Sequence, residues 1–174
     1  WIADSNASLF PAGDKTSVFI IVSFQKNNLL LQIIFINYFQ DVLKRQSVVN
    51  AGVKFVLKNQ LTESKFETFE FVYNNGIVDY VNEFIGEDGL STVQFWQAER
   101  KGRDRADKPD YKLKMNIALC FSNKKQLKEY YHNSSWLEYG GAPEKAVKSA
   151  FVAQIDAYLK QNSKYTKTDA KISF

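Results

Sequence analysis

Residues 111–121 read YKLKMNIALCF, and the large apolar side chains at every second position, with Lys112, Lys114 and Asn116 between them, decide the class of the fold. A two-residue period is typical of a strand that turns one face to a core and the other to water. We expect residues 126–132 to pair with this strand across a turn at Ser122–Lys125. The alternating apolar set is Tyr111, Leu113, Met115, Ile117, Leu119 and Phe121.

A second stretch, residues 143–161, predicts a long helix. Pro143 suits the first helical position, directly after Gly140 and Gly141. Glu144 falls in the first turn, where a carboxylate complements the helix dipole. Apolar residues then recur at spacings of three and four, as on the buried stripe of an amphipathic helix. That stripe consists of Val147, Ala150, Phe151, Ile155, Tyr158 and Leu159.

The other segments add both strands and helices, which indicates an α+β domain with helices on one face of a mixed sheet. The apolar run over residues 17–36 is broken by polar residues at 25–28, so it predicts two buried strands, or one strand and an irregular insert, and no membrane span. We predict strands at residues 17–24, 29–36, 52–58, 65–73 and 91–99, helices at 37–50 and 77–85, loops at 1–16 and 100–110, and the start of a strand at 171–174.

Composition favours a folded cytoplasmic domain. The 174 residues are 45% hydrophobic and 15% aromatic, which is enough to bury a core. Cys120 is the single cysteine and His132 the single histidine, so we expect no disulfide and no metal site. The beginning of the sequence lacks the pattern of a signal peptide, and we expect a reducing compartment.

The charge is mildly basic, at +4 with a pI near 9.0, which is compatible with an anionic partner such as DNA. Acidic residues offset the basic ones over 100–110, so this segment suits a solvated or interdomain loop as well as a DNA contact. Lysines on the faces of strands can contact the phosphates of DNA, or they can serve only to keep the sheet soluble. The candidates for DNA contact are Lys54, Lys58, Arg100, Lys101, Arg103, Arg105, Lys112 and Lys114.

No residue pattern predicts catalysis in this chain. A Cys120–His132 dyad is conceivable, but a buried cysteine and a surface histidine explain the same residues. The carboxylates Asp79 and Glu83, like the neighbouring Glu87 and Asp88, read as solvated charges. The Gly140–Gly141 pair could offer backbone N–H groups to an anion, but it lacks a phosphate-loop context, so a turn into the helix is favoured.

Four stretches, taken in order, carry a resemblance to a known family. They are YFQDVLKRQSVVNAGVKFVLKNQ at residues 38–60, FEFVYNNGIVDYVNEFIG at 69–86, KLKMNIALCFSN at 112–123, and EYYHNSSWLEYGGAPEKAVKSAFVAQIDAYLK at 129–160. This ordered set resembles the transducer domain of the bacterial DNA gyrase B protein and of its topoisomerase IV counterpart, in the Firmicute-like branch. Residues 1–36 match poorly, and residues 37–174 would form a transducer domain that stops before the family's Q-T-K loop.

The resemblance implies a βαβ fold of the ribosomal-protein domain 2-like kind with a left-handed crossover, in which the helix at 37–50 and the long helix after Pro143 back the sheet. It also implies that ATP and magnesium bind elsewhere in the parent enzyme, not in this chain. The implied partners are the GHKL ATPase domain, the DNA-cleaving gyrase A protein and DNA. Asn133, Gly140 and Gly141 become candidates for a loop between domains.

Two rival functions stay open from the sequence. The first is a stand-alone nucleic-acid-binding domain on a related βαβ scaffold, because a fold does not fix a function. The second is a small enzyme that uses Cys120 and His132, which would require a reactive thiol.

Overall fold

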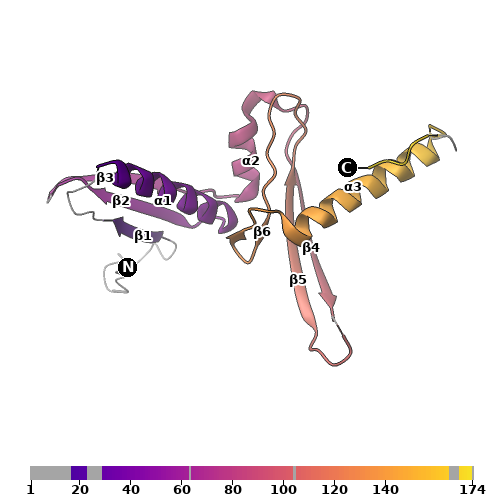
Figure 1. Cartoon of the computed structure of the whole chain (residues 1–174), viewed down its shortest axis with the longest axis horizontal. Coiled ribbons are helices and arrows are strands. Elements are labelled where there is room, and N and C mark those ends of the chain that lie inside the picture. The colour runs from indigo at the N-terminus through magenta and orange to yellow at the C-terminus, as the bar shows by residue number, and fades with distance from the viewer. Residues whose placement is uncertain (1–16, 23–28, 63, 104, 165–168, 174) are drawn as a thin grey trace. The chain divides into compact units, whose positions relative to one another are not determined.

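The computed structural model describes residues 17–22, 29–62, 64–103, 105–164 and 169–173. Helices and small sheets are mixed in it, so the chain has the predicted α+β class (Figure 1). The chain divides into two compact units, one that runs to Gln126 and one over Leu127–Phe174. The loop predicted at residues 1–16 lies outside the described residues.

The first unit begins with a β-α-β arrangement. Strand β1 (Ser17–Val22) runs parallel to β2 (Lys54–Gln60), and helix α1 (Leu29–Val49) connects them. Strand β3 (Phe66–Phe71) pairs antiparallel with β2, so the sheet order is β1-β2-β3 and the sheet is mixed, as predicted. In Figure 1, α1 lies along one face of this sheet. The left-handed sense of the crossover stays a prediction.

The core of this unit lies between α1 and the sheet. Leu43 of α1 packs with Phe55 and Leu57 of β2, and Leu57 is fully buried. Because side chains alternate along a strand, Asn59 shares this inner face, whereas Lys54 and Lys58 lie on the other. Four partly buried residues complete the cluster: Phe39, Val53, Phe69 and Phe71.

The strand predicted at residues 29–36 is wrong, because these residues form the first turns of α1. A short apolar run does not by itself distinguish a strand from a helix, and here the helix is continuous to Val49. Much of this apolar surface stays in water: Ile33 and Ile34 are about half exposed. Tyr38 of the same helix is 61% exposed and takes no part in the core.

The rest of the first unit contains helix α2 (Ile77–Ile85), a 3-10 turn η1 (Gly86–Asp88) and a hairpin. Strand β4 (Gln94–Gly102) pairs antiparallel with β5 (Tyr111–Leu119). Helix α2 therefore has the predicted bounds. The pairing predicted for β5 is wrong, since its partner is β4 and not residues 126–132.

The hairpin also corrects the loop predicted at residues 100–110. Arg100, Lys101 and Gly102 belong to β4, opposite Leu113, Lys112 and Tyr111 respectively. The Tyr111 ring lies over Gly102 and occupies the space where a Cβ would stand, at 2.7 Å from it.

Alternation along β5 is confirmed, but burial of its apolar face is not. Leu113, Ile117 and Tyr111 are each more than a third exposed, and Trp96 opposite Ile117 is half exposed. The first unit covers β5 only partly, where α2 contacts it.

The second unit contains a two-residue hairpin and one long helix. Strand β6 (Tyr131–His132) pairs with β7 (Ser135–Trp136), and helix α3 spans Gly141–Gln161. The helix is present as predicted, but no residue in it is buried. Whether it backs the sheet therefore stays a prediction. Residues 171–173 form no strand, contrary to the prediction, and residue 174 lies outside the described residues.

No helix in the described part of the chain has both the length and the apolar character needed to cross a bilayer.

Candidate nucleic-acid interface

The β4–β5 hairpin gathers basic side chains on one face. Residues directly opposite each other on antiparallel strands point to the same side of the sheet. The register pairs Lys101 with Lys112 and Glu99 with Lys114, so all four lie on one side. We define the polar hairpin face as these four residues together with the next pair, Gln97 and Asn116.

This face has more positive charge than its one carboxylate can neutralise. Glu99 accepts an ion pair from Lys112 at 2.7 Å. The ammonium groups of Lys101 and Lys114 make no ion pair or hydrogen bond with the described residues. Two lysines directly opposite each other, Lys101 and Lys112, disfavour the hairpin unless an anion lies between them or water screens them. The arrangement is therefore able to receive a phosphate.

The basic residues near the hairpin tip are different, because acidic neighbours pair with them. Arg103 donates to Asp110 at 2.6 Å, and Arg105 donates to Asp107 at 3.3 Å. Both pairs are exposed and contribute little to stability. Arg100 lies on the opposite, apolar side of the hairpin and donates to the carbonyl oxygen of Glu99. The tip is consequently a weaker candidate for DNA contact than the polar hairpin face.

The two candidate lysines of β2 lie on the outer face of the three-stranded sheet. Lys54 forms an ion pair with Glu70 of β3 at 3.0 Å. Lys58 has no ion pair among the described residues. Of the eight basic candidates, the structure thus brings together three, Lys101, Lys112 and Lys114.

Two carboxylates that read as solvated charges have structural partners instead. Glu83 of α2 accepts hydrogen bonds from Lys44 of α1 at 2.9 Å and from the Tyr73 hydroxyl at 2.6 Å. Asp79 accepts two hydrogen bonds from Asn75, one from its backbone N–H and one from its side chain. The structural role of Asp79 could have been predicted from the sequence, because Asp79 stands in the first turn of α2, where acidic side chains stabilise the start of a helix.

These contacts shift the acidities of the groups involved. The hydrogen bond from Lys44, and then the one from Tyr73, hold the pKa of Glu83 below its usual value. Burial, together with the neighbouring Glu83 carboxylate, raises the pKa of Tyr73 well above that of a free phenol. The hydrogen bonds from Asn75 lower the pKa of Asp79. Each shift favours the protonation state that keeps the contact.

The loop candidates of the second unit shape turns. Asn133 and Ser134 both have positive φ, at 46° and 66°, and form the two-residue turn between β6 and β7. Gly140, with φ of 69°, precedes the first residue of α3, and Gly141 also has positive φ. The favoured reading of the glycine pair, a turn into the helix, is confirmed.

The start of α3 is not open to an anion, because Glu144 folds back over Gly140. A Cβ added to Gly140 would come within 2.7 Å of the Glu144 Cβ. The Lys148 ammonium pairs with this carboxylate at 2.8 Å, and their hydrogen bond lowers the pKa of Glu144 and raises that of Lys148. A carboxylate already occupies the position that a bound phosphate would need.

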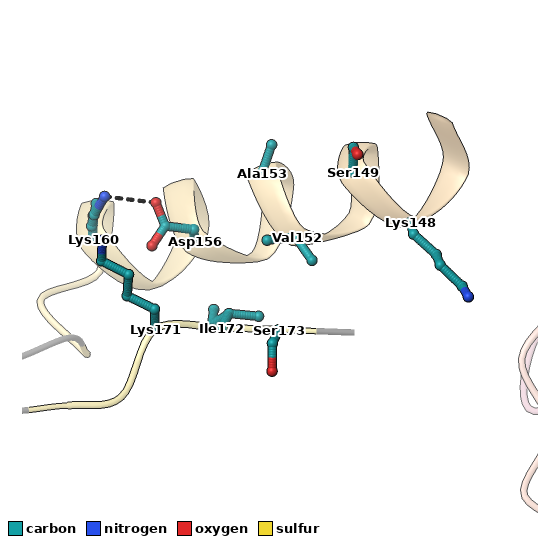
Figure 2. Close-up of a pocket in the computed structure, with 9 residues that line it drawn as sticks. All are labelled: Lys148, Ser149, Val152, Ala153, Asp156, Lys160, Lys171, Ile172 and Ser173. Carbon is teal, nitrogen blue, oxygen red and sulfur yellow. Dashed lines mark hydrogen bonds and ion pairs between the residues drawn. The ribbon is translucent and has the colours of Figure 1, made fainter. Parts of the chain in front are cut away.

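A groove of about 680 Å³ runs between α3 and residues 171–173 (Figure 2). Lys148, Lys160 and Lys171 line it, which makes it a second basic surface. However, Lys148 pairs with Glu144, and Lys160 pairs with Asp156 at 2.6 Å, as the dashed line shows. Most of its positive charge is therefore neutralised.

The described residues contain no group of three or more histidine, cysteine or acidic side chains placed to hold a metal. The space beside Gly140, at the start of α3, is filled by Glu144. Cys120 is half-buried, and its thiol donates to the Ser91 carbonyl oxygen at 3.1 Å. No basic group activates the thiol in these contacts.

Comparison with known proteins adds one finding. A family model described as DNA gyrase B matches residues 76–174, which is more than half of the chain. The match includes α2, the β4–β5 hairpin and the whole second unit, whereas β1, α1 and β2 precede it. Among curated proteins, no sequence matched the chain.

Proposed function

Because the chain belongs to the DNA gyrase B family and carries a domain of a type II topoisomerase B protein, we propose that it is the transducer domain of that protein. In this role it couples ATP binding and hydrolysis in a GHKL domain to movement of the DNA gate and to strand passage. The family match over residues 76–174 is the observation that carries the proposal.

Several features of the chain suit a part that transmits movement. Such a part needs rigid elements that move as bodies. Helix α3 is 21 residues long, and two ion pairs, Glu144–Lys148 and Asp156–Lys160, reinforce it at a spacing of four residues. In the first unit, one cluster of side chains ties α1 to α2 through Lys44 and Glu83.

DNA is the partner that the polar hairpin face suits. Residues 94–119 contain seven basic and four acidic residues, a surplus of three positive charges. Lysines on a strand face contact phosphates without reading bases, which suits an enzyme that handles DNA of any sequence. Binding should then be weak and lost as salt rises.

Catalysis belongs, in this proposal, to the parent enzyme, an ATP-dependent DNA topoisomerase that works in the cytoplasm. ATP and magnesium would bind its GHKL domain, and the gyrase A protein would supply DNA cleavage. We expect the isolated chain to be catalytically inactive, because the resemblance assigns ATP hydrolysis to the GHKL domain and DNA cleavage to the gyrase A protein.

The proposal is tested by titrating the chain against fluorescent duplex DNA of arbitrary sequence over a salt series, with a matched RNA. We expect weak binding that is indifferent to sequence. The double change Lys101→Gln/Lys114→Gln should reduce the slope of log affinity against log salt by about 1.8, the value for two lost phosphate contacts. The control Lys65→Gln/Lys145→Gln removes the same charge from outside this face and should leave the slope nearly unchanged.

Other outcomes would redirect the proposal. Tight RNA binding or a clear sequence preference would favour a stand-alone nucleic-acid-binding domain. Equal effects of the two double changes would show that net charge, and not the polar hairpin face, attracts the duplex. Absence of any binding would remove DNA contact from the role of this chain.

A further inference from the structure

Asn75 and Gly76 form the one asparagine–glycine pair in the sequence, and they lie directly before α2. In such a pair the backbone nitrogen of the glycine can attack the side-chain amide carbon of the asparagine, because glycine has no Cβ to hinder the approach. This reaction is one reason why asparagine is a thermolabile residue. Asn75 is exposed, so water can reach its side chain. The proposed function gives this pair no role.

Asp79 holds Asn75 by two hydrogen bonds. Its Oδ1 atom accepts from the Asn75 Nδ2 group at 2.9 Å, and its Oδ2 atom accepts from the Asn75 backbone N–H at 2.8 Å. The bond from the backbone, and then the one from the side chain, lower the pKa of Asp79, so its carboxylate stays charged at neutral pH. The Gly76 N–H donates to the Tyr73 carbonyl oxygen at 3.1 Å. Both the attacking nitrogen and the amide that it would attack are therefore hydrogen-bonded in the folded chain.

We propose that Asn75 is a site of spontaneous deamidation, and that its contacts with Asp79 at the start of α2 limit the rate. When these contacts open, the Gly76 nitrogen forms a bond to the Asn75 Cγ atom. The proton of that nitrogen passes through water to the departing NH2 group, which leaves as ammonia, and a cyclic imide remains. A water molecule then adds to one of the two imide carbonyl carbons and opens the ring. Aspartate or isoaspartate stands in the chain afterwards.

The product of this reaction fits its surroundings less well than Asn75 does. A charged oxygen replaces the Nδ2 donor, so two carboxylates face each other at the position of Asp79, and like charges at this distance repel. The backbone has little room to adjust, because Gly76 is buried and an added Cβ there would lie 3.0 Å from the Val48 carbonyl oxygen. Deamidation should therefore loosen the start of α2.

The test incubates the full chain at mildly alkaline pH and follows the peptide that contains Asn75 by mass spectrometry, which distinguishes aspartate and isoaspartate from asparagine. Unfolding the chain in urea should speed the reaction by about tenfold or more, because hydrogen bonds to a charged group no longer hold the amide. Asp79→Ala should speed the reaction in the folded chain by about tenfold, for the same reason. Glu83→Gln is the matched control, since Glu83 belongs to the same helix but contacts Lys44 and Tyr73, and it should change the rate less.

Circular dichroism verifies that the variants fold, and Asn75→Gln identifies the signal, because its longer side chain forms a cyclic imide far more slowly. Equal rates in the folded and the urea-unfolded parent chain would overturn the proposal, since the fold would then give Asn75 no protection. Equal acceleration by Asp79→Ala and Glu83→Gln would overturn it too, because general loosening of α2 would set the rate. Absence of reaction at Asn75 in urea would exclude the site altogether. DNA takes no part in this test, so its result is independent of the proposed function.

Discussion

The Tyr73 hydroxyl donates a 2.6 Å hydrogen bond to the Glu83 carboxylate, and Tyr73 is itself only 8% exposed. Lys44 donates to the other carboxylate oxygen at 2.9 Å and lies over the Tyr80 ring. The two tyrosine rings meet edge to face, with centroids 5.7 Å apart. A single polar cluster thus joins α1, α2 and the segment that follows β3.

Removing the phenol should weaken the first unit. Tyr73→Phe keeps the ring but leaves Glu83 with one donor fewer, so we expect a loss of about 1–2 kcal/mol in the free energy of unfolding. Urea denaturation measures it. Tyr38→Phe is the control, because Tyr38 is 61% exposed, and its change should stay within about 0.5 kcal/mol. Equal effects of the two changes would contradict a structural role for the bond.

The same cluster predicts a dependence on pH. The folded-state pKa of Glu83 is lowered, first by Lys44 and then by Tyr73, so the fold prefers the charged carboxylate. This stabilisation is complete above the usual glutamate pKa of about 4.3 and is lost as pH falls through the lower folded value. Glu83→Gln should therefore destabilise the chain near neutral pH and approach the parent chain in acid. Glu87→Gln, at an exposed carboxylate, should leave the acid-unfolding curve unchanged.

Lys125 should stabilise the end of α2. Its ammonium donates to the carbonyl oxygens of Phe84 and Ile85, at 2.9 and 3.2 Å, where a helix leaves carbonyls without partners. We expect Lys125→Met to cost about 1 kcal/mol and to speed hydrogen exchange in α2. Lys124→Met, which removes only an exposed pair with Asp88, should cost less than Lys125→Met. The reverse order would exclude the cap.

Two glycines with positive φ differ in how closely other atoms surround them. Gly52 and Gly76 both have positive φ, but an added Cβ meets nothing within 4 Å at Gly52 and lies 3.0 Å from the Val48 carbonyl oxygen at Gly76. We expect Gly52→Ala to cost about 1 kcal/mol from φ alone, and Gly76→Ala to cost clearly more. Thermal unfolding of both variants tests this order.

Local patterns predicted the elements that have clear boundaries or a regular alternation of side chains. Helix α2 has its predicted bounds because glycines flank it, and β5 has its alternating pattern. Residues 29–36 were misassigned because LLLQIIFI has the composition of a strand, and only the continuation to Val49 makes it helical. The pairing of β5 with β4 was not predicted, because the charged residues 100–110 have the composition of a loop, which hid the end of β4.

The sequence identified the basic residues of the candidate site, but it did not predict which of them lie together on one surface. Lys101, Lys112 and Lys114 meet only because of the β4–β5 register, which the sequence does not state. The neutralisation of Arg103 and Arg105 by nearby acids is local, and the balance of charge over residues 100–110 indicated it.

The most direct test of the coupling role uses the full-length gyrase B protein assembled with the gyrase A protein, and measures strand passages per ATP hydrolysed. For Lys101→Glu/Lys114→Glu we predict a ratio lower by about tenfold, the effect of about 1.4 kcal/mol of lost DNA contact. Lys65→Glu/Lys145→Glu should retain the parent ratio. If both double variants pass as many strands per ATP as the parent enzyme, the polar hairpin face takes no part in coupling ATP to DNA movement.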